Sequence, residues 1–310
     1  MAAGSDKKIA GARLILILCM IIFGSIGIMV RYINMPSSVI ALFRSSIGAA
    51  LLIVIMLIKR ENIDKQAMKD GLLWLIVSGI AMAFNWILLF EAYNYTSIAT
   101  ATMCYYFAPI IVIYVSPVIL REKLSKRDII CVLVAIVGML SVSGFLNGGI
   151  SSISELIGVF MGLGAAVLYA FIILTNKKIP SMPALQKTTI QLISAAVVML
   201  LYSLIRGHFD GIDLMAASSM PGFMWEGGVL ALLLIVGLFH TGMAYALYFY
   251  SLRYIPAGSV AIMSYIDPVV AVILSALLLA EIPDIWTVAG AVMIIGAAIV
   301  NELPSAAADR

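Results

Sequence analysis

The sequence repeats itself: residues 88–122 read LLFEAYNYTSIATATMCYYFAPIIVIYVSPVILRE, and residues 247–281 read LYFYSLRYIPAGSVAIMSYIDPVVAVILSALLLAE. The two stretches align without a gap, with Pro109 opposite Pro268 and Glu122 opposite Glu281. The other identical pairs are Leu88 and Leu247, Phe90 and Phe249, Tyr95 and Tyr254, Tyr106 and Tyr265, Ser116 and Ser275, and Leu120 and Leu279. Proline and glutamate are uncommon in this chain, so their coincidence at one spacing indicates an internal repeat.

The composition is typical of a protein embedded in a lipid bilayer. Of its 310 residues, 63% are hydrophobic and 11% are charged, and the mean hydropathy is +1.12. Soluble globular proteins have about 25% charged residues, so this chain has too few charges to cover a surface in water. The net charge is +3, without the basic patch interleaved with aromatic residues that nucleic-acid binding requires. The composition therefore predicts a membrane protein that binds no nucleic acid.

Several apolar runs are long enough to cross a bilayer, which takes about 20 residues of helix. We predict ten spans, at residues 13–32, 38–58, 71–93, 97–120, 128–146, 156–175, 184–205, 228–250, 257–279 and 285–301. With the N-terminus in the cytoplasm, sixteen Lys and Arg residues, Lys187 among them, lie inside and only Arg31 and Arg206 lie outside. An even number of spans returns the C-terminus to the cytoplasm. We therefore expect a multi-pass protein of the inner (cytoplasmic) membrane with both termini inside.

The predicted fold class is all-α, with ten transmembrane helices in two five-helix repeats, residues 1–146 and 156–301. Because five is an odd number, the second repeat enters the membrane from the opposite side to the first. Inverted repeats of this kind underlie many alternating-access transporters, whose binding site lies near the midplane between the halves. Two related halves of opposite orientation give two conformations of comparable energy, each open to one side.

Several pieces of the chain together carry a family resemblance. They are the blocks Ala108-Pro109 through Arg121-Glu122 and Asp267-Pro268 through Ala280-Glu281, the helices Ile129 to Ser143 and Thr287 to Asn301, and Phe43-Arg44. With these pieces the chain resembles the drug/metabolite transporter superfamily, specifically the EamA-like ten-helix exporters. The resemblance implies two homologous five-helix units around a central cavity, working without ATP. It also implies export of small metabolites, often amino acids.

Ionisable groups inside a membrane are costly, so each one within a span is a candidate functional residue. Arg44 lies in the outer half of the second span, and Glu91 lies near the outer end of the third. Arg44 is either structural, by pairing with Glu91 or by snorkelling, or it binds a substrate carboxylate. The sequence leaves both interpretations open.

Asp267 and His240 lie near the centres of the ninth and eighth spans, too deep for either side chain to reach water. A carboxylate in lipid is costly to keep charged, and histidine changes its charge near neutral pH. The two groups could therefore take up and release a proton as the cavity changes sides. The alternative is that Asp267 is neutral and caps backbone groups beside Pro268, while His240 is hydrogen-bonded in the packing.

Pro109 and Pro268 lie near mid-bilayer at equivalent repeat positions, and each removes one helical backbone hydrogen bond. The two prolines are either hinges whose freed carbonyl groups help to bind a ligand, or simple kinks for packing. In the first span, Gly24 and Gly27 are expected to allow close helix packing.

Polar aromatic and amide side chains gather at the same depth, where their polar atoms need partners. They are Asn85, Trp86, Tyr105, Tyr106, Tyr169, Tyr245, Tyr248 and Tyr265. The predicted substrate-binding set is Arg44, Asn85, Trp86, Tyr106, His240, Tyr245, Tyr265 and Asp267, with Pro109 and Pro268 as hinges. Such a site suits amino acids, aromatic compounds or, through cation–π attraction, organic cations.

The leading prediction is a secondary active or facilitative transporter that exports small metabolites, most of all amino acids, by alternating access. A multidrug or organic-cation exporter is the alternative, favoured if an acidic group rather than an accessible arginine dominates the site. A membrane-embedded enzyme of lipid or cell-wall metabolism is a second class. Two histidines argue against a His-based metal site, and no nucleotide-binding loop is present. We expect no cofactor or metal, a small-molecule substrate and the bilayer as partners, and leave the oligomeric state open.

Overall fold

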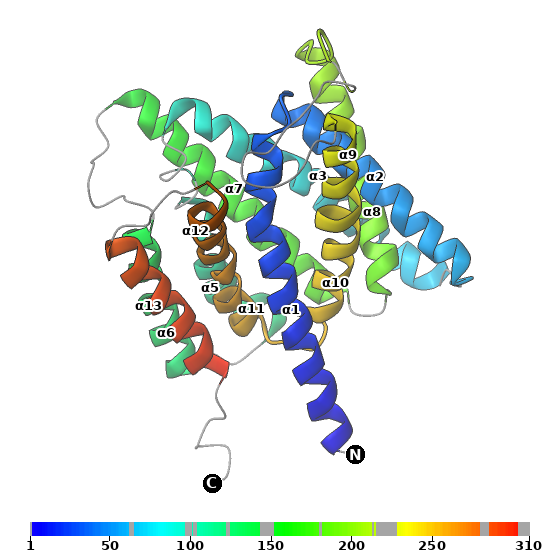
Figure 1. The fold of residues 1–310 in the computed structure, drawn as a ribbon. Coiled ribbons are helices and arrows are strands. Elements are labelled where there is room, and N and C mark those ends of the chain that lie inside the picture. The colour runs from blue at the N-terminus through cyan, green and yellow to red at the C-terminus, as the bar shows by residue number, and fades with distance from the viewer. Residues whose placement is uncertain are drawn as a thin grey trace.

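A computed structural model of the chain describes residues 2–61, 65–96, 101, 104–121, 125–142, 152–179, 182–212, 214, 228–279 and 285–302. The described part is helical (Figure 1). Its elements are α1 (Ala2–Arg31), α2 (Ser37–Ile58), α3 (Lys65–Tyr95), α5 (Ala108–Leu120), α6 (Lys126–Val142), α7 (Ile153–Lys178), α8 (Ala184–Ile205), α9 (Val229–Ile235), the π-helix η2 (Val236–Met243), α10 (Ala244–Ser251), α11 (Ala257–Met263), α12 (Ile266–Leu279) and α13 (Ile285–Glu302). Glu122, Glu281 and the predicted repeat boundary at residue 146 lie outside the described residues.

The described helices include six that are long and apolar enough to cross a membrane. They are Lys8–Val30, Ser37–Ile58, Met68–Ala92, Ile153–Lys178, Ala184–Ile205 and Val229–Ser251, and shorter apolar helices lie at Ala108–Leu120, Ala257–Ala271 and Val288–Ala297. Large apolar side chains such as Leu57 and Val118 point outward and are exposed. In lipid such side chains are in their preferred solvent, so the prediction of an all-α polytopic membrane protein is confirmed.

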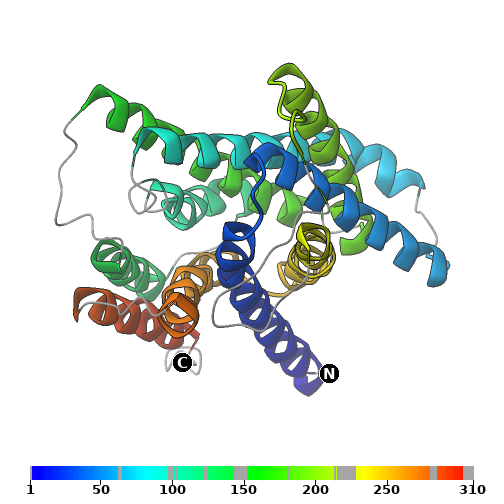
Figure 2. The same cartoon turned by 45° about the horizontal axis from the view of Figure 1, so that its top comes forward.

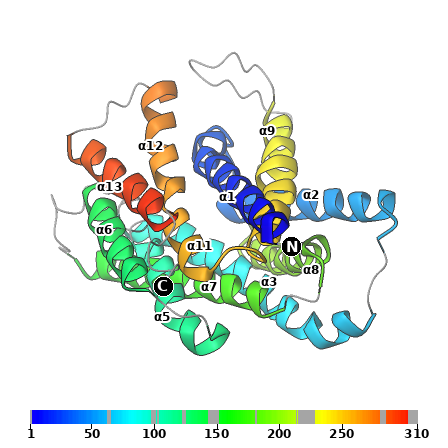
Figure 3. The same ribbon diagram turned by 90° about the horizontal axis from the view of Figure 1, so that it is seen from below.

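Contacts between helices come in reciprocal pairs. In chain order, α1, α2, α3, α5 and α6 correspond to α7, α8, the α9–η2–α10 segment, the α11–α12 segment and α13. The contact between α3 and α7 corresponds to the contact between α10 and α1 in the other half. In the same way, the contact between α2 and η2 corresponds to that between α8 and α3. The contact between α5 and α7 corresponds to that between α12 and α1. Three further contacts join a helix to its own counterpart: α2 to α8, α5 to α11, and α6 to α13, the last pair side by side at one edge in Figures 1, 2 and 3. Exchanging two related halves about a pseudo-two-fold axis produces this pattern.

The fourth and ninth spans are interrupted at matching positions. A turn at Tyr106 and Phe107 precedes α5, and a turn at Ser264 and Tyr265 separates α11 from α12. Pro109 then lies in the first turn of α5 and Pro268 in the first turn of α12, where a missing N–H leaves no helical hydrogen bond unmade. The expectation that each proline removes a helical hydrogen bond is therefore wrong, because each proline lies in the first turn of a new helix.

Small residues allow the closest helix crossings. A Cβ atom added to Gly48 of α2 would lie 2.9 Å from the backbone N of Gly242 in η2, and one added to Gly79 of α3 would lie 2.5 Å from the carbonyl oxygen of Gln191 in α8. Backbones can approach this closely only where no side chain intervenes. The two crossings are counterparts of each other, α2 with η2 and α8 with α3.

Lys187 corrects the count of loop charges. The sequence counts it among the charges on the cytoplasmic side, but it lies in the first turn of α8 with 0% of its surface exposed, so it is not a loop charge. Its Nζ donates to the carbonyl oxygens of Asn176 at 2.8 Å and Ile179 at 2.9 Å. Those carbonyls lie at the C-terminal end of α7, where a helix lacks internal donors and its dipole favours a positive charge. The lysine therefore ties α8 to the end of α7.

Candidate functional site

Arg44 is held at the crossing of α2, α3 and η2. Its Nε donates to Oγ1 of Thr241 at 3.0 Å, and its Cζ lies 4.7 Å from the centroid of the Trp86 ring. Only 6% of the residue is exposed. The neutral hydroxyl and the aromatic face attract the guanidinium without cancelling its charge, so Arg44 remains a buried cation able to attract an anion.

The π-helix η2 sets the position of Thr241. Its hydroxyl donates to the carbonyl oxygen of Val236 at 3.0 Å, five residues earlier, and also accepts from Arg44. π-Helical turns are rare and occur frequently at functional sites. Sequence reasoning missed Thr241, because neither a single threonine nor a π-turn stands out in an apolar span. Gly237 and Gly242 on either side of it were the available signal, since each meets α2 at close range.

His240 contacts α1 through its side chain. Its Nε2 lies 2.9 Å from Oγ of Ser25, whose own hydroxyl donates to the carbonyl oxygen of Ile22 at 2.8 Å. Because the serine hydrogen is used for Ile22, the bond requires Nε2 to carry a proton and donate it. Of the two interpretations of His240, these contacts correspond to the one in which it is hydrogen-bonded in the packing.

Aromatic side chains extend from Arg44 across the centre of the bundle. Trp86 lies edge-on to Tyr245 at 6.3 Å between ring centroids, and Tyr245 lies 5.0 Å from Phe23 of α1. The side-chain hydroxyl of Tyr248 lies 3.1 Å from that of Tyr169 in α7. The cluster thus combines side chains from both halves of the chain.

The same aromatic cluster continues to the two broken helices. Tyr105 stacks on Tyr169 with 5.4 Å between centroids and lies 5.5 Å from Tyr106. The hydroxyl of Tyr265 donates to the carbonyl oxygen of Tyr106 at 2.9 Å, so the two residues that the repeat aligns join their turns to each other. This bond supplies a donor to a carbonyl freed by the helix break, as a membrane interior requires.

Asp267 lies in the first turn of α12, beside the same aromatic cluster. Its carboxyl group accepts a hydrogen bond from the side chain of Tyr106, and it is near enough to Tyr245 and Tyr169 to interact electrostatically with both. Tyr245 interacts with Arg44 as well. One aromatic side chain is therefore shared by a buried cation and a carboxyl group.

Two residues near this cluster are bound elsewhere. The amide of Asn85 donates to the carbonyl oxygen of Ala165 in α7 at 2.6 Å, which ties α3 to α7. Glu91 accepts from the hydroxyl of Tyr202 at 2.8 Å and from Asn94 at 3.2 Å. Since Arg44 bonds instead to Thr241, the interpretation that pairs Arg44 with Glu91 is wrong.

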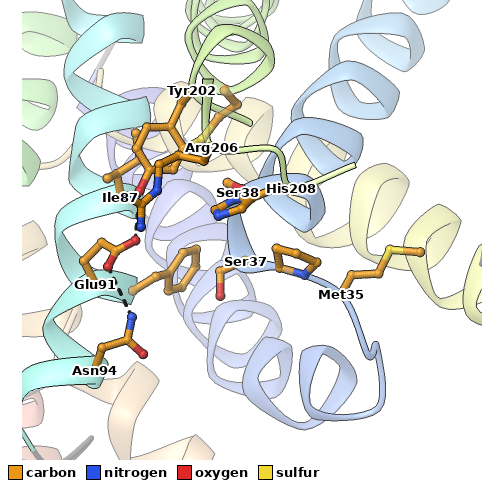
Figure 4. A pocket seen from close by; sticks show the side chains of 12 residues that line it. Met35, Ser37, Ser38, Ile87, Glu91, Asn94, Tyr202, Arg206 and His208 are labelled. Carbon is orange, nitrogen blue, oxygen red and sulfur yellow. Dashed lines mark hydrogen bonds between the residues drawn. The ribbon is translucent and has the colours of Figure 1, made fainter. Parts of the chain in front are cut away.

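A separate cavity of about 310 Å³ lies toward the end of α3, next to the start of α2 and the end of α8 (Figure 4). Its lining residues are Met35, Pro36, Ser37, Ser38, Ile87, Phe90, Glu91, Asn94, Met199, Tyr202, Arg206 and His208. Sequence reasoning considered Glu91 only as one alternative partner for Arg44, and so missed this site. Within the described ranges, no group of three or more His, Cys, Asp or Glu side chains could hold a metal ion.

Comparison with known proteins assigns the family. The model of the EamA-like transporter family matches the chain twice, at residues 11–144 and 156–302. This chain belongs to the EamA-like transporter family. It is a membrane transporter and not an enzyme, so the alternative of a membrane-embedded enzyme is wrong, and the resemblance to EamA-like proteins is confirmed.

Relatives of this EamA-like transporter occur in bacteria and in humans. It is 27% identical to the uncharacterized transporter YxxF of Bacillus subtilis, over 94% of this chain and 89% of that protein. It is 26% identical to human solute carrier family 35 member G1, over 74% of this chain and 63% of that protein. A solved crystal structure with 16% sequence identity has a TM-score of 0.80 and covers 94% of this chain and 98% of its own, which shows that the two share a fold.

Proposed function

We propose that this transporter exports small metabolites, above all amino acids or related compounds, and that it binds them in the aromatic cluster that includes Arg44 and Asp267. The observation that carries the proposal is the placement of Tyr245, which interacts with both of these ionisable groups. An amino acid has a carboxylate and an ammonium group on neighbouring atoms. A cation and a carboxyl group within reach of one aromatic ring match that pattern of charge.

Each group has a defined task in this proposal. Arg44 binds the substrate carboxylate through guanidinium N–H groups other than the Nε–H given to Thr241. Asp267 accepts from the ammonium group, and the faces of Trp86 and Tyr245 attract its charge. Tyr106 and Tyr265 position Asp267 and the helix break beside it.

Alternating access follows from the reciprocal contacts of the halves. We propose that residues 1–146 and 156–301 are the two units that rock against each other, with the turns before Pro109 and Pro268 as hinges. The support is that both helix breaks fall at aligned positions and are joined by the bond from Tyr265 to Tyr106. A hinge needs residues that change backbone angles without breaking helical hydrogen bonds, and a break that already exists supplies them.

Proton coupling through Asp267 belongs to the same proposal. A carboxyl group among aromatic rings releases its proton readily only when a cation or water approaches. Binding of a substrate ammonium group and protonation of Asp267 therefore exclude each other. In this scheme His240 stays bonded to Ser25 and acts on α1 packing, not as the proton carrier.

We also propose that both termini lie in the cytoplasm of the producing cell and that the protein resides in the cell membrane. The excess of Lys and Arg on one side supports this orientation. The start of α1 and the end of α13 point to the same end of the bundle (Figure 1), as an even number of spans requires.

An organic-cation exporter is the second candidate, because the same cluster combines aromatic faces with Asp267. Counterflow in proteoliposomes, with panels of amino acids and of quaternary ammonium compounds, separates the two. We expect amino acids to drive counterflow in the wild type and Arg44→Gln to abolish it. Counterflow by quaternary ammonium compounds that survives Arg44→Gln, with none by amino acids, would establish the cation exporter instead.

A further inference from the structure

The cavity of about 310 Å³ at the start of α2 is lined by side chains of opposite charge. Glu91 comes from the end of α3, while Arg206 and His208 come from the turn that follows α8; Figure 4 draws Arg206 on the Glu91 side and His208 beside Ser38. Asn94 and Arg206 are exposed, so the cavity opens to the surface. From the geometry of these groups we infer that the cavity is a second, outer solute site, which binds the ammonium group of an amino acid at Glu91 and its carboxylate at Arg206 and His208.

The Glu91 carboxylate is fixed before any ligand arrives. Tyr202 donates to Oε1 at 2.8 Å and Asn94 donates to Oε2 at 3.2 Å. A carboxylate has about four lone-pair positions, so each oxygen keeps one for a further donor. An oriented carboxylate with unused lone pairs is suited to an ammonium group, which has three N–H donors.

The turn that follows α8 supplies donors for a carboxylate. His208 uses Nδ1 for the hydroxyl of Ser38, 2.7 Å away, and its ring lies edge-on to Tyr202 at 5.9 Å. When Nδ1 accepts from Ser38, the proton of the neutral ring is on Nε2, which can donate to a ligand. The guanidinium of Arg206 close to Tyr202 adds planar paired donors, the arrangement that best matches a carboxylate.

Size favours an amino acid over a larger compound. Sites for drug-sized ligands span roughly 300–1,000 Å³, and this cavity of about 310 Å³ is at the lower limit. Ile87, Phe90 and Met199 form an apolar wall for a side chain. A bulky organic cation would exceed the space and would also meet Arg206.

The cavity is on the same two helices as the central cluster. Glu91 follows Trp86 by five residues on α3, a rise of about 7.5 Å, and Ser38 precedes Arg44 by six residues on α2, about 9 Å. Ile87, the neighbour of Trp86, lines the cavity. A solute leaving the central site along α2 and α3 would enter this cavity next. The choice of an amino acid as its ligand rests on the proposed function.

The test uses a fluorophore beside the cavity. Ser37 is an exposed lining residue, whereas Cys19, Cys104 and Cys131 are buried, so Ser37→Cys directs a maleimide-bimane label to the rim. The labelled protein in nanodiscs is titrated with L-alanine, L-leucine and L-phenylalanine. We expect a saturable response to at least one of them, and the same response in the Arg44→Gln background, where the central site is lost.

Variants then assign the two ends of the ligand. Glu91→Gln should weaken binding by about ten-fold, the typical effect of losing one charged hydrogen bond. The matched control Asp210→Asn, an exposed carboxylate of the turn after α8, should have no effect. In Arg206→Gln, the amino acid and its methyl ester should bind equally, whereas the wild type should prefer the free acid.

Three outcomes of the binding measurements would refute the outer site. These outcomes are a wild type that never saturates, a response that Arg44→Gln abolishes, or Glu91→Gln that folds and binds like the wild type. If Glu91→Gln does not fold, the ester comparison in Arg206→Gln decides, and an unchanged preference for the free acid refutes the assignment. Counterflow of amino acids without a bimane response would refute the outer site alone. A bimane response without counterflow would refute the proposed transport function alone.

Discussion

Replacing Gly24 by alanine tests how α1 positions the helix that carries Asp267. A Cβ atom at residue 24 would lie 2.5 Å from the backbone oxygen of Asp267 and 2.8 Å from Cβ of Val270, well inside the 3.4 Å at which ordinary contact begins. The nearest obstacle is backbone, so α1 and α12 must separate. Overpacking of this kind costs about 1–3 kcal/mol, whereas alanine in a helix gains about 1 kcal/mol over glycine.

Gly27 is the matched control, three residues further along α1. Nothing lies within 4 Å of a Cβ atom added there, so Gly27→Ala keeps the helix gain without the clash. The two variants should therefore differ in unfolding free energy by about 1–3 kcal/mol, with Gly24→Ala the less stable. At roughly 2–4 °C for each kcal/mol in chains somewhat shorter than this one, the difference is several degrees of Tm.

The assay combines thermal stability and transport. Tm is measured by fluorescence-detected size-exclusion chromatography after heating, and counterflow is measured in proteoliposomes at equal protein content. Gly24→Ala should lower both, because moving α12 also moves Asp267. A Gly24→Ala variant as stable as Gly27→Ala would refute the packing of α1 on α12 and with it the geometry of the proposed site.

Three further substitutions test separate parts of the site and fold. Arg44→Gln should fold normally and lose counterflow by about 100-fold, since a charged hydrogen-bonded contact contributes roughly 1.5–3 kcal/mol, and wild-type rates in a well-folded variant would exclude substrate contact. Asp267→Asn should weaken counterflow, because the amide lacks the charge that binds the ammonium group, and the net transport that remains should no longer depend on a pH gradient. An unchanged dependence would end its coupling role. Lys187→Met should lower the unfolding free energy by about 2–4 kcal/mol, because two buried carbonyls lose their donor. Its control, Lys178→Met, alters an exposed side chain and should leave Tm within about a degree.

The membrane spans and the correspondence between the two halves could be predicted, because they depend on the length and composition of the apolar runs and on the sequence repeat. A run of about 20 apolar residues needs a helix in lipid whatever its neighbours are. The aligned prolines marked the two helix breaks, although the sequence suggested kinks within continuous spans. A proline shows where a helical hydrogen bond is missing, but not that Tyr265, in the turn before Pro268, bonds to Tyr106 in the other half of the chain.

The direction in which each side chain points, and so the helix that it contacts, could not be predicted from the same sequence. In a soluble helix the polar side faces water, but a helix that is apolar all round carries no such mark. Gly24 and Gly27 look alike in sequence, yet only Gly24 meets another helix at close range. Asn85 shares its depth with Trp86 but bonds to α7, because adjacent residues on a helix point about 100° apart.

Lys187 shows the limit of counting charges. The positive-inside rule counts a lysine near the end of a span with the loop charges, and it treats Lys187 at the start of span 184–205 like Lys178 beyond span 156–175. The burial of Lys187 depends on the end of α7 arriving beside the start of α8, with carbonyls that need a donor. Such a requirement appears only once the two helices are placed.

The equivalent helix crossings of the two halves show whether packing requires the charge of Arg44. Pro36 precedes α2 and Pro183 precedes α8 with nearly the same backbone angles, and Arg44 and Gln191 are both the eighth residue of their helices. Arg44 bonds to Thr241 where α2 crosses η2, and Gln191 bonds to Ser78 at 2.6 Å where α8 crosses α3. A neutral amide thus serves the same packing position in the other half, so the packing itself does not need a charge. Helix packing therefore does not account for the desolvation of a guanidinium at this crossing, and under the proposed function the anionic group of a transported solute offsets it.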